Sequence, residues 1–182
     1  TMVGQVEDFP RFVTLIGHGS VSDNNPFESA LDCGACGGAI SLPNVRTLCM
    51  IANSMMVREK MKEKGIEIPE STKFIPGMHI TTTDEIQFFD TDILTPEEME
   101  TLESIRQDFT QASKLARDER IQALPYTHSH KDVMNKTRDW SETRPEWGLA
   151  QNMGVFAGPR STTKHLTFNN RLFMHSYDWR VD

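Results

Sequence analysis

Short apolar segments that alternate with amphipathic ones constrain the fold of this chain more than any other feature. The segment RFVTLIG at 11–17 is apolar and closed by glycine, which predicts a buried strand ending at about Gly17. From Pro43 the apolar residues recur at helical spacing, and they predict a helix over 43–62 with the proline in its first turn. The segments TKFIPGMHITTTD and EIQFFD are rich in β-branched and aromatic residues and predict two further strands.

A helix-capping sequence marks the clearest helix of the chain. Thr95 is predicted to cap it, a proline takes the next position, and Glu98 completes a capping box. The helix is predicted over 96–118, and strands in MGVFAGP and RLFMHSYDW follow an irregular region at 125–150. This alternation of strands and helices predicts an α/β fold.

The composition and charge exclude several classes of protein. With 37% hydrophobic residues the chain is too apolar to be disordered, and its apolar runs are shorter than the roughly eighteen residues of a membrane span. No secretory signal opens the chain, and three cysteines at uneven spacing do not suggest a disulfide scaffold, so we expect a reducing compartment. The net charge of −7 disfavours nucleic acid as a main partner.

The Gly-rich segment GHGSVSDNNPFESALDCGACGG carries the residues with the strongest chemical character. It places His18 and Cys33 fifteen residues apart, and imidazole and thiolate are ligands that zinc prefers. The cysteine lies just before the predicted helix, whose N-terminus would favour the thiolate form that binds metal. A complete site needs further ligands, and the local candidates are Asp32, Cys36 and His79. These residue types predict a zinc site.

The same residues allow other interpretations. The His–Cys pair can be a coincidence of spacing, and Cys33-x-x-Cys36 can be a redox couple, although it lacks the aromatic-Cys-Gly-Pro-Cys setting of thioredoxins. The glycines could form a phosphate loop, but GHGSVS fits neither of the two common phosphate-binding patterns. Cys49 lies on the apolar stripe of the predicted helix and is expected in the core. His128 and His130 are expected in a solvated loop.

Three blocks of the sequence resemble the signature blocks of one family. They are the Gly-rich segment at 17–38, RDWSETRPEWGLAQN with the following AGPR, and RLFMHSYD at 171–178, and they occur in the family's order. The chain thus resembles the DUF2309 (UPF0753) family, described as the inorganic carbon transporter subunit DabA, over nearly its whole length (12–178). The resemblance implies an α/β fold similar to that of a β-class carbonic anhydrase, with a mixed or parallel sheet flanked by helices.

The resemblance also implies a zinc centre and its ligands. The family's site takes a Cys and an Asp from an upstream C-x-D-x-R motif, followed by a His and a second Cys that match His18 and Cys33. No C-x-D-x-R motif occurs in these 182 residues, so we interpret the chain as a piece of a longer protein, with 1–182 a single domain or part of one. The nearby residues that could orient the histidine are Asp23, Asn24, Asn25 and Asp32.

The activity implied for the full-length protein is hydration of CO2 to bicarbonate within an energy-coupled inorganic carbon pump. The implied partner is DabB, a membrane subunit related to proton-pumping antiporter subunits, and the implied location is peripheral, on the cytoplasmic face of the cell membrane. The piece by itself is expected to be inactive, because two ligands do not fix a tetrahedral zinc site. The alternative is a structural zinc module, or an interaction module that docks the membrane subunit without catalysis.

Overall fold

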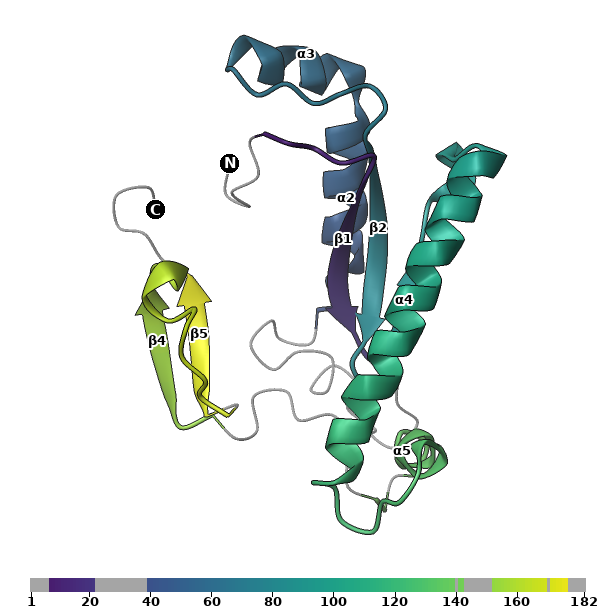
Figure 1. Cartoon of the computed structure of the whole chain (residues 1–182), viewed down its shortest axis with the longest axis vertical. Helices are drawn as coiled ribbons and strands as arrows, with labels where there is room; N and C mark the ends of the chain where they lie inside the picture. Colours follow the sequence, from purple (N-terminus) through teal and green to yellow (C-terminus); the bar gives the residue numbers. More distant parts are fainter. Residues whose placement is uncertain (1–6, 22–38, 140, 143–151, 170, 177–182) are drawn as a thin grey trace. The chain divides into compact units, whose positions relative to one another are not determined.

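The computed structural model describes residues 7–21, 39–139, 141–142, 152–169 and 171–176, and these form the α/β structure that the sequence predicts. Contacts divide the chain into two compact units, Thr1–Pro145 and Glu146–Asp182. The first unit contains, in chain order, β1 (Phe12–Gly19), α2 (Leu42–Asn53), α3 (Met55–Glu63), β2 (Lys73–Ile80), β3 (Glu85–Phe88), the 3₁₀ turn η1 (Thr91–Ile93), α4 (Pro96–Ile121) and α5 (His130–Lys136) (Figure 1). None of the helices in this described part is long and apolar enough to cross a membrane.

The first unit is built on a three-stranded sheet in the order β1-β2-β3. β1 and β2 are parallel, and β3 returns antiparallel to β2 after the turn at 81–84. The strands predicted from the sequence are confirmed, but β1 ends at Gly19 and not at Gly17. The extension has a physical cause, since the N–H of Thr81 donates to the carbonyl of Gly19 at 2.8 Å and continues the pairing of β1 with the end of β2.

Helices pack on both faces of this sheet. Because alternate residues of a strand point to opposite faces, Ile75 of β2 lies on one face, where it forms the core with Phe88 and with Leu102 of α4. α2 packs against β1 and β2 on the other face, and its Cys49 is buried there near Phe74. Each helix therefore packs on the sheet with only part of its predicted apolar stripe, since Cys49 and Leu102 are buried whereas Leu48 of α2 and Met99 of α4 are exposed.

The helix predicted over 43–62 is interrupted in the structure. It forms α2 and α3, separated by Ser54, whose backbone is extended (φ −71°, ψ 123°). The side chain of Asn53 accounts for the break: its amide donates to the carbonyl of Phe74 at 2.8 Å, and its Oδ1 accepts from the N–H of the same residue at 2.9 Å. These two bonds tie the end of α2 to β2, and the chain starts a new helix one residue later.

α4 confirms the clearest helix prediction. Thr95 Oγ1 accepts from the N–H of Glu98 at 3.2 Å, and the carboxylate of Glu98 accepts from the N–H of Thr95 at 2.9 Å, so the predicted capping box is present. α5 lies in the region that the sequence predicts to be irregular, and that prediction is wrong there. Seven residues are too few to show helical periodicity, although Ser129 caps this helix by accepting from a backbone N–H.

The second unit contains a parallel pair of strands, β4 (Gly154–Gly158) and β5 (Leu172–Ser176), with the 3₁₀ turn η2 (Arg160–Thr162) between them in the chain. Both strands lie in segments that the sequence predicts as strands. The guanidinium of Arg160 donates to the carbonyl of Met174 at 3.2 Å, so this cation fixes the turn to β5.

Candidate functional site

His18 lies at the carboxyl end of β1, next to the start of α2. Its carbonyl accepts from the N–H of Ser41 at 2.9 Å, and its Nδ1 shares a hydrogen bond with the Ser41 hydroxyl at 2.5 Å. The same hydroxyl lies 3.4 Å from Nε2. The shorter contact makes Nδ1 the main partner of the serine, and Nε2 is the ring nitrogen that the hydroxyl contacts more weakly.

The glycine before this histidine lets the start of α2 approach the strand. A Cβ at Gly17 would stand 2.7 Å from the Cβ of Ser41, a distance at which one of the two segments would have to move. Ser41 immediately precedes α2 and lies 23 residues from His18 in the sequence. Sequence reasoning considered only nearer polar residues as partners of the ring, and those residues lie outside the described part of the chain.

His79 is the register partner of His18 on the neighbouring strand β2. Residues paired in a parallel ladder project from the same face of the sheet, on strands about 4.8 Å apart. The face is the one that α4 covers, and both histidines line one open hollow of about 610 Å³ together with Phe109 and Ser113 of α4. The structure thus brings His79, a candidate ligand in the sequence, next to His18.

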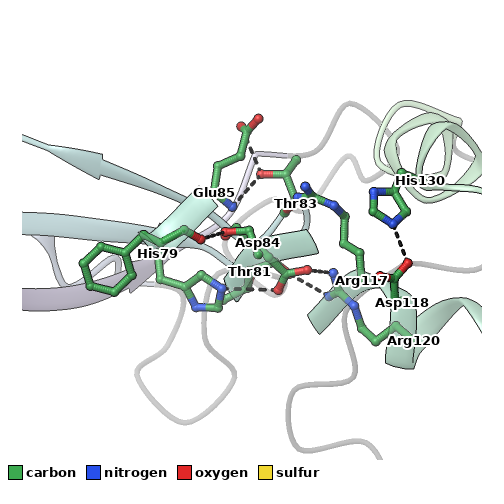
Figure 2. A network of polar contacts seen from close by, with 11 residues as sticks. His79, Thr81, Thr83, Asp84, Glu85, Arg117, Asp118, Arg120 and His130 are labelled. Atoms are coloured by element: carbon green, nitrogen blue, oxygen red, sulfur yellow. Dashed lines mark hydrogen bonds and ion pairs between the residues drawn. The ribbon is translucent and has the colours of Figure 1, made fainter. Parts of the chain in front are cut away.

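Asp84 holds the ring of His79, as Figure 2 shows. Its Oδ1 lies 3.3 Å from His79 Nε2, and its Oδ2 pairs with the guanidinium of Arg120. Because a carboxylate only accepts, Nε2 carries the proton of the neutral ring and Nδ1 keeps its lone pair. Burial, and then the positive charge of Arg120, lower the pKa of His79 below its ordinary value. The contact at pH 7 is therefore a hydrogen bond from a neutral imidazole.

Three side chains of α4 fix the turn that carries Asp84. Ser113, Arg117 and Arg120 each donate to a backbone carbonyl of the turn at 81–84. Figure 2 shows the two arginines beside this turn. Asp84 has a left-handed backbone (φ 60°), a conformation that aspartate adopts more readily than most residues. Polar groups on this part of α4 therefore position the turn, whereas the earlier part of the helix fills the core.

The described residues fit one part of a zinc site. The Ser41 hydroxyl lies closer to Nδ1 of His18, at 2.5 Å, than to Nε2, at 3.4 Å, so Nε2 is the ring nitrogen with the weaker contact. Cys33, the second predicted ligand, lies outside the described residues, as do Asp32 and Cys36. Within the described residues, no group of three or more His, Cys, Asp or Glu side chains is placed to hold a metal ion. A complete site therefore needs donors such as Cys33 in addition.

The other residues singled out in the sequence have ordinary structural roles. Cys49 is buried as predicted, and burial together with the negative charge of Asp90 raises the pKa of its thiol to about 12. His128 is exposed in a loop, as predicted, but His130 is the first residue of α5, and its Nε2 lies 2.6 Å from a carboxylate oxygen of Asp118 on α4. The interaction of His130 serves to join two helices.

Comparisons with a family model and with individual proteins all point to one family. Residues 1–182 match the family model described as "Probable inorganic carbon transporter subunit DabA". Proteins of the same description from Sulfurihydrogenibium azorense, Hydrogenobaculum sp. and Aquifex aeolicus are 52%, 53% and 50% identical to this chain. Each alignment covers all of this chain and 19% of the relative, so the chain spans about a fifth of the length of these relatives. No solved structure matches the chain.

Proposed function

The chain belongs to the DabA family, and we propose on that premise that the full-length protein is a zinc-dependent subunit of an energy-coupled inorganic carbon pump. In this proposal the full-length protein hydrates CO2 to bicarbonate, and His18 and Cys33 supply two of its zinc ligands. The setting of His18 carries the proposal, because the Ser41 hydroxyl binds mainly Nδ1 and orients the ring so that Nε2, its weaker contact, could bind a metal.

The residues of this chain would contribute orientation and an apolar surface to the reaction. Zinc held by His18 and Cys33 would lower the pKa of water toward about 7 and so would supply a nucleophile for CO2. Ser41 and the close approach at Gly17 keep the imidazole of His18 in one orientation. The hollow beside the histidine suits an uncharged gas such as CO2, since most of its walls are apolar. These apolar walls are Ile16, Val45, Ile86, Phe109, Ala112 and Ala116.

The proposal includes a membrane partner. The relatives are described as subunits of a transporter, and a subunit acts with other chains. We assign the partner to DabB, the membrane subunit that the sequence resemblance implies, and we assign the protein a peripheral position on the cytoplasmic face of the membrane.

The test uses the full-length protein with His18→Ala or Cys33→Ala, and with His128→Ala as a matched control at an exposed imidazole. Zinc per chain, recovery of the membrane partner and growth at ambient CO2 are measured for each variant. We expect the two ligand variants to lose zinc and growth while the complex still assembles, and the control to behave as wild type. Normal growth after loss of zinc would refute the catalytic role. Loss of the complex together with zinc would support a structural zinc module instead.

A second comparison tests which cysteine binds. Cys36→Ser in the full-length protein should retain more zinc than Cys33→Ser, because the family pattern assigns ligation to Cys33. Equal loss in both variants would show that the assignment to one cysteine is wrong. The 182-residue chain alone should show no zinc-dependent CO2 hydration in a stopped-flow indicator assay, since it holds too few ligands for a tetrahedral site.

A further inference from the structure

We propose that the outer edge of β1 is paired, in the full-length protein, with a further strand from the part of the same polypeptide that lies outside these 182 residues. The sheet of the first unit has the order β1-β2-β3, so among the described residues β1 has a strand neighbour on one side only. The inference concerns how this sheet is completed, and it holds or fails independently of the zinc site.

The hydrogen bonds of β1 show which of its backbone groups point outward. The carbonyls of Arg11, just before β1, and of Gly19, at its end, accept from N–H groups at the start of β2 and just after its end, each at 2.8 Å. In a parallel pair alternate residues of a strand bond to a given neighbour, so the odd-numbered residues of β1 face β2. The even-numbered residues direct their N–H and C=O groups away from it. The carbonyl of His18 agrees with this, because it accepts from Ser41 and not from β2.

Three of these outward residues, Phe12, Thr14 and Ile16, have no hydrogen-bond partner for their backbone groups within the described part of the chain. All three are partly buried. A backbone N–H or C=O that is shielded from water needs a hydrogen-bond partner. A row of such groups along one edge of a sheet is the template to which another strand binds.

The side chains of β1 are less buried than those of its neighbour. β2 is buried from Phe74 to Gly77, whereas the residues paired with them on β1, 13–16, are only partly buried. Parallel sheets are normally covered on both faces, and their strands are apolar along their length, as β1 and β2 are. β1 therefore has the sequence of an interior strand, although the described residues leave it at an edge.

The opposite edge of the sheet has the features of a protected edge. β3 contains only four residues, and Glu85 and Gln87 are polar and exposed. Short length and charge are devices by which soluble proteins prevent an edge from pairing. β1 has eight residues, FVTLIGHG, and contains no lysine, arginine, aspartate, glutamate or proline. A free edge of this composition promotes aggregation, so a paired edge is the better explanation.

The rest of the polypeptide is the occupant that the comparisons favour. The chain covers 19% of its relatives from Sulfurihydrogenibium azorense and Hydrogenobaculum sp., so about four fifths of such a protein lies outside it. A strand of the same polypeptide reaches the edge at high effective concentration and covers it as the protein folds. A membrane subunit or a second copy would cover the edge only after assembly, and the apolar strand would be exposed until then.

The test measures amide exchange of single residues in the full-length protein, purified without its membrane partner, by mass spectrometry with electron-transfer fragmentation. The N–H groups of Val13 and Leu15 face β2 and serve as internal references. We expect the outward N–H groups of Thr14 and Ile16 to exchange within about 10-fold of these references, because both rows are hydrogen-bonded. Exchange more than about 10-fold faster than the references would show that the edge is free and would overturn the inference.

A proline on the outward row tests the same pairing by substitution. Thr14→Pro removes an N–H that a free edge does not use but that a paired strand donates to its neighbour. We expect it to raise the exchange rate of the Ile16 amide more than about 10-fold, and we expect the control Thr14→Val, which keeps the N–H, to leave that rate unchanged. Equal rates in the two variants would contradict the pairing. If Thr14→Pro does not fold, the wild-type comparison of outward and inward amides decides.

Dilution and cross-linking identify the strand that pairs with β1. We expect the protection of Thr14 and Ile16 to be independent of protein concentration, and we expect photo-leucine at Leu15 to cross-link to a peptide outside residues 1–182. Protection that is lost on dilution would assign the edge to a second copy, and protection that appears only with the membrane subunit would assign it to that partner. Cross-links confined to residues 1–182 would assign it to this chain. Each of these three results would overturn the inference and leave the proposed function standing, because none of them measures zinc.

Discussion

Replacing Arg120 by methionine tests whether α4 controls the turn between β2 and β3. The substitution keeps most of the aliphatic volume and removes the charge. It also removes the guanidinium N–H that donates to the carbonyl of Thr81 at 3.2 Å, and it breaks the ion pair with Asp84. The carboxylate of Asp84, 10% exposed, is then left without its cation.

The expected loss of stability in Arg120→Met follows from the burial of Asp84. Removing one partner of a buried ion pair costs about 3–5 kcal/mol, because the other charge remains desolvated. His79 still donates to the Asp84 carboxylate and Ser113 still donates to its backbone, so we expect the low end, about 3 kcal/mol. The matched control is Arg46→Met, which breaks the pair with Asp90. Those side chains are 51% and 38% exposed, and such a pair is worth about 0–1 kcal/mol.

Hydrogen exchange of the full-length protein, measured by mass spectrometry, reports the loss of local stability at the turn. The N–H of Asp84 donates to the carbonyl of Ile80 at 2.7 Å, and its exchange reports opening of the turn. A loss of about 3 kcal/mol raises the exchange rate at the turn roughly 150-fold, whereas the Arg46→Met control should raise it less than about 6-fold at α2 and η1. Equal, small effects in both variants would show that α4 does not hold the turn, and the reasoning from the buried pair would fail.

Three further outcomes follow from the packing and capping. Leu102→Ala should lower the free energy of unfolding by about 2–5 kcal/mol, because this side chain is fully buried in the core. The control Met99→Ala on the same helix removes a side chain that is 38% exposed and should lower it by less than about 1 kcal/mol. Equal losses in denaturant titrations would contradict the assigned core. Thr95→Ala should cost about 0.5–2 kcal/mol through loss of the capping box with Glu98, and an unchanged midpoint would show that the cap contributes nothing. Cys49 should resist iodoacetamide in the native protein at pH 8, since a pKa of about 12 leaves roughly one thiol in ten thousand ionised. Rapid labelling of Cys49, measured in peptide maps, would show that this thiol is not buried.

Local sequence rules predicted the elements that carry their own signals. The capping box at Thr95 and the apolar stripe after it located α4, and a β-branched apolar run located β1. The rules failed where a distant contact decides the local structure. Ser54 interrupts a helix because Asn53 binds the backbone of β2, and β1 ends at Gly19 because Thr81 extends the pairing. Neither partner is visible from the periodicity of the segment itself.

The site was predictable only in part for the same physical reason. Residue type alone made His18 a candidate, but its partner Ser41 lies 23 residues away, and the carboxylate that contacts His79 depends on a turn held by a third element. In a parallel sheet the carboxyl ends of neighbouring strands meet at one edge, so residues from separate segments converge there. The register pairs His18 on β1 with His79 on β2 at that edge. If His18 binds zinc as proposed, the remaining donors of the full-length protein have to reach this end of the sheet, on the face that α4 covers.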